Sequence, residues 1–284
     1  MFRLLPSAVI CATITAAICL VATPLPLFQI AKQYAKSILF YPLGPWIDGV
    51  YWTLGIEVSF YSLVFLLLCL RRKNLIEPVM IGIGLVSMAL WIGSGAAAPA
   101  LLPTRYMQLL LLHHGMHFAL GVVLCASYTN GLTKWRAAFC AVFLAGGVLP
   151  IAFQARETIG IPSLVPQTVW VASVLLMMLA VTFDARISEF LSDRAKRNIA
   201  RMGVATYPLY LLHDIAGAWI MTLMAWAGRY VALLSSMVVI TIAALAIGAF
   251  LDTQPVRTFI KAAIARAIRI VPLKQDLPEQ QTPL

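Results

Sequence analysis

A single carboxylate, Glu57, lies inside an otherwise apolar run of the chain, and residues of this kind can take part in acid–base chemistry. The run extends from Tyr51 to Leu70, long enough for a helix to cross the ~30 Å hydrocarbon core of a bilayer. A charged side chain at that depth costs on the order of 3 kcal/mol, and its default interpretation is functional. The alternative is that Glu57, about two turns from the start of the run, only extends to the interface.

The four histidines are the other titratable candidates, and all lie in apolar runs: His113, His114, His117 and His213. A spacing of four places His113 and His117 on one helix face, with His114 on the next. This spacing can bind a metal, but the segment supplies no third ligand and no organising carboxylate, so we predict no metal site. Polar packing between helices is the more common role.

His213 lies in the segment ATYPLYLLHDIAG, where Tyr210 shares its helix face and Asp214 follows directly. An imidazole that titrates near neutrality beside a carboxylate suits general acid–base catalysis. A buried structural pair explains this segment equally well.

The composition indicates the class of protein that positions these residues. Hydrophobic residues make up 61% of the 284-residue chain and charged residues 11%, whereas a soluble domain is roughly 25% charged. The net charge of +10 does not indicate nucleic-acid binding, because the basic residues lie between apolar runs. The five cysteines lack paired metal spacing and are expected to be small core residues.

Apolar runs of bilayer length predict an all-α polytopic membrane protein with about eight transmembrane helices. Helices are expected because they satisfy their own backbone in lipid, and no strand-length alternation at barrel spacing is present. The predicted spans are Ser7–Leu27, Tyr51–Leu70, Val79–Ala97, Tyr106–Ser127, Ala137–Phe153, Val165–Phe183, Val204–Trp226 and Tyr230–Leu251.

The positions of the basic residues support eight spans. With this count, sixteen of the 21 Lys and Arg residues fall on the side of the two termini. The five on the opposite side are Lys32, Lys36, Arg105, Arg156 and Arg229. Such asymmetry follows the positive-inside rule and predicts cytoplasmic termini.

The segments outside the spans have more limited roles. The first span resembles a secretory signal, but its apolar run is long and no clear cleavage site follows, so we expect it to remain uncleaved. Pro42 and Pro45 are expected to block a regular helix in the outward connection Gln29–Gly49. Residues 1–256 should form one transmembrane domain. Residues 257–284 should form a basic amphipathic segment on the membrane lipids, followed by a disordered cytoplasmic tail.

Several segments resemble the acyltransferase-3 family of membrane O-acyltransferases. WTLGIEVSFYSLVFLL is similar to the family signature W-S-L-x-x-E-x-x-F-Y, and MGVATYPLYLLHDIAG resembles its late G-x-x-S-Y-x-x-Y-L-x-H segment. HHGMHFALGVVL and LDTQPVRTFIKAA are similar to two further family segments in the same order. The resemblance covers essentially the whole chain. Gly55, Ile56, Thr206 and Asp252 depart from the usual residues.

The resemblance implies acyl transfer from a cytoplasmic donor, typically acyl-CoA, to a hydroxyl of a carbohydrate or lipid-linked acceptor. It implies no bound cofactor and a location in a bacterial cytoplasmic membrane. Glu57 and His213 would then be catalytic. The residues expected to bind substrate are Trp52, Tyr61, His113, His117, Tyr207 and Tyr210.

Family members usually carry about two more spans at the front, with an arginine and a catalytic histidine, and this chain resembles the family from the third helix onward. The start could therefore lie upstream, His213 or the His113–His117 face could substitute, or the chain could be an inactive membrane subunit. A transporter that uses Glu57 and the histidines for proton coupling is a further alternative. Such a protein should show repeats or broken half-helices, and none is evident in the sequence.

Overall fold

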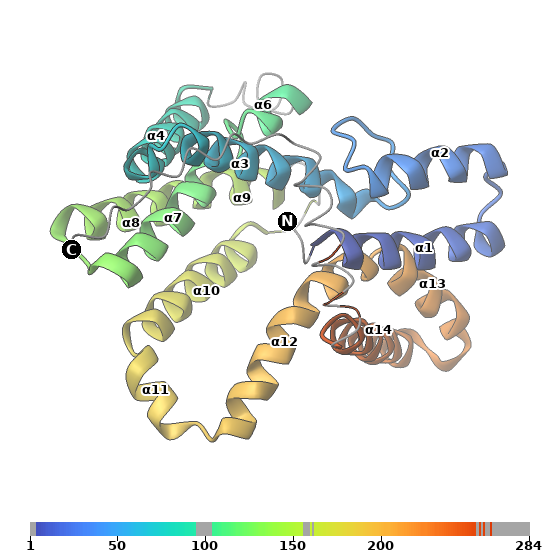
Figure 1. Ribbon diagram of the computed structural model, residues 1–284. Coiled ribbons are helices and arrows are strands. Elements are labelled where there is room, and N and C mark those ends of the chain that lie inside the picture. The colour runs from blue at the N-terminus through green and yellow to red at the C-terminus, as the bar shows by residue number, and fades with distance from the viewer. Residues whose placement is uncertain are drawn as a thin grey trace, which may run out of the picture. The chain divides into compact units, whose positions relative to one another are not determined.

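The computed structural model describes residues 4–94, 104–155, 160, 162–253, 256, 258 and 262, and these residues form helices and connecting turns with no strand (Figure 1). The helices are α1 (Leu4–Ala22), α2 (Leu27–Ile38), η1 (Gly49–Tyr51), α3 (Trp52–Cys69), η2 (Lys73–Leu75), α4 (Ile76–Ser94), α6 (Arg105–Leu109), α7 (Gly115–Asn130), α8 (Lys134–Gly146), α9 (Val148–Gln154), α10 (Leu164–Thr182), α11 (Asp184–Phe190), α12 (Asp193–Leu212), α13 (Ile215–Leu223), η5 (Ala225–Ala227) and α14 (Arg229–Leu251).

Six helical segments among the described residues are long and apolar enough to cross a membrane, and each overlaps one of the predicted spans. They are Leu5–Ala22, Gly49–Cys69, Lys73–Gly93, Lys134–Gln154, Leu164–Thr182 and Arg229–Leu251. Their outer surfaces carry large apolar side chains, such as Phe65, which is 66% exposed. An all-helical integral membrane protein with several spans is therefore confirmed.

The two remaining predicted spans are not continuous helices, which corrects the prediction. Within 106–127, α6 ends at Leu109 and α7 begins only at Gly115. Within 204–226, α12 continues to Leu212 and α13 begins at Ile215. Neither break follows from glycine or proline at the break itself, because residues 110–114 and 213–214 contain neither.

The connection 29–49 also differs from the prediction, since most of its first half is the helix α2. The helix ends at Ile38, before Pro42 and Pro45. The following loop folds back toward the C-terminal end of α2, where Lys36 Nζ donates to the carbonyl of Gly44 at 2.7 Å. Residues 184–202 are largely helical, in α11 and the start of α12. The predicted amphipathic segment and tail, 257–284, lie outside the described residues except for 258 and 262.

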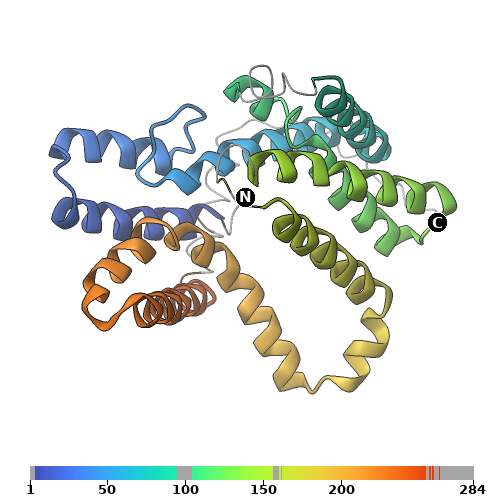
Figure 2. The same ribbon diagram turned by 180° about the vertical axis from the view of Figure 1, so that it is seen from behind.

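The described chain divides into two compact units, and residues 1–34 and 199–284 make up the first. In this unit α1 packs against α13 and α14, which lie side by side in both views (Figures 1 and 2). Close approach of α13 and α14 is possible because Gly217 lacks a side chain, and the Ser236 hydroxyl donates to its carbonyl at 3.0 Å. Small residues at helix contacts are typical of membrane proteins.

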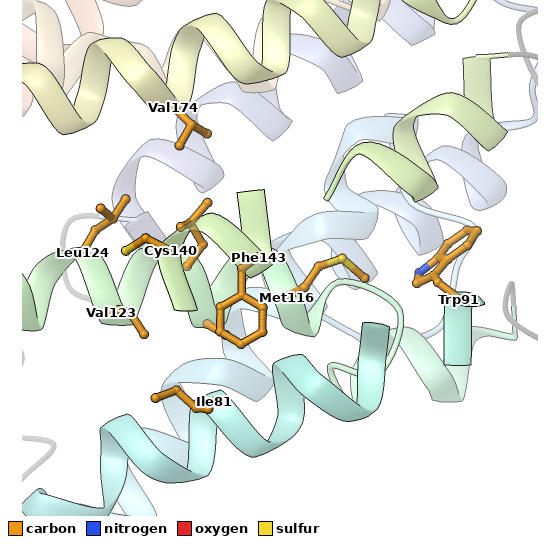
Figure 3. Close-up of a cluster of buried hydrophobic side chains, with 10 residues drawn as sticks. Ile81, Trp91, Met116, Val123, Leu124, Cys140, Phe143 and Val174 are labelled. Carbon is orange, nitrogen blue, oxygen red and sulfur yellow. The ribbon is translucent and has the colours of Figure 1, made fainter. Parts of the chain in front are cut away.

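Residues 35–198 form the second unit, whose core lies among α4, α7, α8 and α10. Figure 3 shows side chains from these helices gathering around Phe143 of α8, which is fully buried. Gly84 and Gly115 allow α4 and α7 to approach closely, because a Cβ at either position would lie under 3.0 Å from atoms of a neighbouring helix. The core therefore places the start of α7 against α4 with little freedom.

An ion pair fastens α4 to α8 at one end of this unit. Arg136 donates from Nε and Nη2 to the two carboxylate oxygens of Glu77, at 2.8 and 2.9 Å. Its remaining Nη1 donates to the carbonyl of Gly131 at 2.8 Å. Such a bidentate arrangement holds both side chains in one geometry.

Candidate functional site

The break between α6 and α7 brings three histidines together. Leu111 has a φ of +62° and turns the chain in the left-handed region that a leucine rarely adopts. As a result His113 precedes α7, so His113 and His117 do not share one continuous helix face as predicted. Instead His113 Nδ1 lies 2.9 Å from His114 Nε2, and the rings of His114 and His117 are 6.2 Å apart.

Each of the three histidines faces a tryptophan from a different helix. Trp91 of α4 lies 5.1 Å from the His113 ring, Trp52 of α3 lies 5.6 Å from the His114 ring, and Trp170 of α10 lies 4.9 Å from the His117 ring. We call these six residues the His–Trp cluster. Sequence analysis identified His113, His117 and Trp52. His114 was named there only as a titratable residue on the next helix face. Trp91 and Trp170 were missed, because helices distant in sequence supply them.

The cluster also satisfies the backbone at the helix break. Trp91 Nε1 donates to the carbonyl of His113 at 3.1 Å, and the amide of Leu112 donates to the carbonyl of Met107 at 2.9 Å. Non-helical backbone at membrane depth is tolerated only where it is buried in protein or lines a water-filled cavity. The break is therefore a supported part of the second unit.

Arg105, at the start of α6, ties the break to the start of α3. Its Nη2 donates to the carbonyl of Trp52 at 2.8 Å and its Nε to that of Pro42 at 2.6 Å. A Cβ on Gly55 would lie 2.6 Å from Nη2, so the glycine leaves room for the guanidinium. This contact accounts for Gly55, one of the positions where the chain departs from the residues usual in the family.

Glu57 lies on α3, about one and a half turns beyond Trp52, and is partly buried. Within the described residues its carboxylate makes no hydrogen bond and no ion pair. Phe60 and Tyr61 follow on the same helix face, and Tyr61 is 39% exposed. The carboxylate is thus available to a substrate group or to water.

An apolar groove of about 460 Å³ lies between α3 and α7. We call it the α3–α7 groove; its lining residues are Phe60, His117, Phe118, Gly121, Val122 and Cys125. The Phe60 and Phe118 rings stack with their centroids 5.0 Å apart. The buried Nδ1 of His117 has no hydrogen-bond partner among the described residues. The carbonyls of His114 and Gly147 lie near the ring, but neither has hydrogen-bond geometry to Nδ1.

His213 belongs to the first unit and lies at the end of α12, where the helix breaks. Its Nδ1 is 2.6 Å from the carbonyl of Tyr210, so Nδ1–H donates to that oxygen and Nε2 carries the lone pair. The Tyr210 ring lies 5.6 Å away, and the His213 side chain is exposed. No hydrogen bond or ion pair joins His213 to Asp214 in the described part of the chain, unlike the pairing considered from sequence.

The predicted site residues therefore fall into two groups, each described within its own unit. The second unit contains Glu57, Trp52, Tyr61, His113 and His117, and the first contains His213, Tyr207 and Tyr210. Among the residues of the second unit, the structure brings Trp52, His113 and His117 into one cluster. Over the described residues, no three His, Cys, Asp or Glu side chains are arranged to hold a metal ion.

Comparison with known proteins connects this arrangement to a reaction class. Neither curated proteins nor solved structures give a match. The sequence model of the acyltransferase-3 family, described as an acyltransferase domain, matches residues 1–252. This match includes both helix breaks, the His–Trp cluster and Glu57. The chain therefore belongs to the acyltransferase-3 family and is a membrane acyltransferase.

Proposed function

We propose that this enzyme moves an acyl group from a cytoplasmic donor such as acyl-CoA to a hydroxyl of a carbohydrate or lipid-linked acceptor, in a bacterial cytoplasmic membrane. His213 is the base. The observation that carries this assignment is the hydrogen bond from His213 Nδ1 to the carbonyl of Tyr210 at 2.6 Å. It holds the tautomer in which Nε2 can accept a proton, and the exposed ring can be reached by an acceptor.

The step requires one proton transfer and one bond exchange. His213 Nε2 takes the proton of the acceptor hydroxyl as its oxygen attacks the thioester carbonyl carbon. The new C–O ester bond forms and the C–S bond breaks. The leaving thiolate takes up the proton from the imidazolium, which returns His213 to its starting state.

The groups of the second unit serve binding in this proposal. Glu57 can accept a hydrogen bond from a polar group of a substrate, because its carboxylate is partly buried and makes no hydrogen bond to the described residues. Trp52 packs against His114, which contacts His113 and His117, and these aromatic rings with few charges suit a sugar or an apolar group. Tyr61, Tyr207 and Tyr210 supply hydroxyl groups for further contacts.

The broken segments 105–130 and 193–223 complete eight spans in this proposal, with both termini in the cytoplasm. The distribution of the basic residues supports this count. Most of them lie on the side of the two termini only if an even number of spans separates the termini. Discontinuous spans are known in membrane proteins, where they border substrate and ion sites.

Chemical rescue tests the role of His213. Purified full-length chain is supplied with a radiolabelled acyl-CoA and a panel of hydroxyl acceptors. We expect His213→Gly to lose at least 100-fold in turnover, typical of a general base, and to recover part of it with added imidazole. The matched control is Thr222→Val, an exposed α13 residue whose hydroxyl bonds only locally to Ala218. Loss without rescue, or full activity in His213→Gly, would contradict the assignment.

Glu57→Gln provides the second arm of the test. The amide keeps the size of the side chain but loses its charge, so we expect KM for the acceptor to rise while the chain still inserts and folds. Wild-type turnover with Glu57→Gln would remove the proposed role. A wild-type chain that shows no acyl transfer alone, but does so with a partner protein, would identify a non-catalytic subunit instead.

A further inference from the structure

The α3–α7 groove lies at one end of the His–Trp cluster, and the proposed reaction does not yet use it. We propose that it binds the hydrocarbon chain of the transferred acyl group. The acyl group is then longer than acetyl. This inference rests on the proposed function and specifies its donor.

The dimensions of the groove fit a chain rather than a two-carbon group. Its lining extends along α7 from His117 to Cys125, which is about 12 Å at the rise of an α-helix. An extended hydrocarbon advances somewhat less than one ~1.5 Å bond per carbon, so this length takes about eight to ten carbons. The volume of about 460 Å³ is within the usual range for a ligand pocket.

The chemistry of the lining selects a neutral ligand with a single polar end. Its wall is aromatic and aliphatic, and His117 is its one ionisable group apart from the Cys125 thiol. The His117 ring lines the groove, so a polar end of the ligand can lie beside it. A phosphate-bearing lipid head would require cationic groups, and the groove lining contains none.

Gly121 is the position at which a substitution can fill the groove without disturbing helix packing. Glycine is unfavourable in the middle of a helix, and at Gly84 and Gly115 a close approach of neighbouring atoms explains it. At Gly121 no atom lies within 4 Å of an added Cβ, so helix packing does not require the glycine. Because Gly121 lines the groove, any side chain there would occupy the space that a ligand needs.

Gly82 is a matched control for substitution. It also lies in a helix of the second unit, is exposed, and has no atom within 4 Å of an added Cβ. It does not line the groove. Gly121→Leu and Gly82→Leu therefore add the same side chain in open surroundings, and only the first fills the groove.

Binding is measured without turnover on full-length chain in nanodiscs, using acyl-CoA analogues whose thioester is replaced by a stable thioether ketone. Cys125 lines the groove and Cys69 lies at the end of α3 outside it, and both are exposed. Protection from maleimide labelling at Cys125, with Cys69 as the internal reference, reports occupancy. We expect affinity to rise about fourfold per methylene from two to about eight carbons, because the chain leaves water.

Gly121→Leu should abolish this chain-length dependence, and Gly82→Leu should keep it. If Gly121→Leu does not fold, Val122→Phe fills the same groove and takes its place. Equal affinity for all chain lengths, equal protection of Cys69, or identical behaviour of the two leucine variants would overturn the inference. Tight binding of long analogues without any acyl transfer would refute the proposed function alone. Transfer with flat chain-length dependence would refute the groove assignment alone.

Discussion

Replacing Gly84 with alanine should destabilise the second unit, although alanine is the better helix former. An added Cβ would lie 2.6 Å from the Cβ of Ala119 and 2.8 Å from two ring carbons of Phe143. Both neighbours are fully buried and carbon atoms prefer 3.5–4.0 Å, so α4 and α7 must separate. Overpacking of this kind costs about 1–3 kcal/mol. The better helix propensity of alanine offsets at most ~1 kcal/mol of this cost.

With the full offset the net loss is up to about 2 kcal/mol, which corresponds to a fall of up to about thirtyfold in the ratio of folded to unfolded protein. Cys140 reports it directly, because this thiol lies in the same core and is 1% exposed. Its maleimide labelling rate in detergent micelles should rise for Gly84→Ala. Gly82→Ala, two residues earlier with open space around it, should label no faster than wild type. Equal labelling rates in the two alanine variants would refute the packing argument.

Two further predictions concern the break at α6 and α7. Gly55→Ala places a methyl group where Arg105 Nη2 lies, so we expect it to break the hydrogen bond from Nη2 to the Trp52 carbonyl. A hydrogen bond from a charged group contributes ~1.5 kcal/mol, and losing it should lower turnover about tenfold. Its melting temperature should change little, since the guanidinium is the end of a flexible side chain, and unchanged turnover would count against the role of this contact. Trp91→Phe keeps a ring but removes the donor to the His113 carbonyl, so the free energy of unfolding should fall by about 1–3 kcal/mol. A denaturant midpoint equal to wild type would show that water or another group satisfies that carbonyl.

The spans were predictable because each depends on a local property of the sequence. A continuous apolar run of bilayer length indicates a helix without reference to the rest of the chain, and six such runs are helices of spanning length. The break before α7 was not predictable in this way. It passes through Leu111 in a left-handed conformation, and an apolar stretch with a leucine at that position has the pattern of an uninterrupted helix.

In the candidate site, too, local sequence identifies some residues, and only the fold brings the others to the site. Glu57 and His213 are unusual in their own segments, so local sequence identifies them as candidates. Trp91 and Trp170, two of the three tryptophans that face the histidines, come from α4 and α10, and nothing near them in sequence marks them. Their role depends on the close approach of α4 and α7 at Gly84 and Gly115, which is a property of the folded unit.

The two helix breaks put their histidines to different chemical uses. At the end of α12, the backbone carbonyl of Tyr210 occupies Nδ1 of His213, which leaves Nε2 on an exposed ring as a proton acceptor. At the start of α7, the His117 ring packs against Trp170 in the cluster and also lines an apolar groove. Exposure and a held tautomer suit His213 to the transfer of the hydroxyl proton.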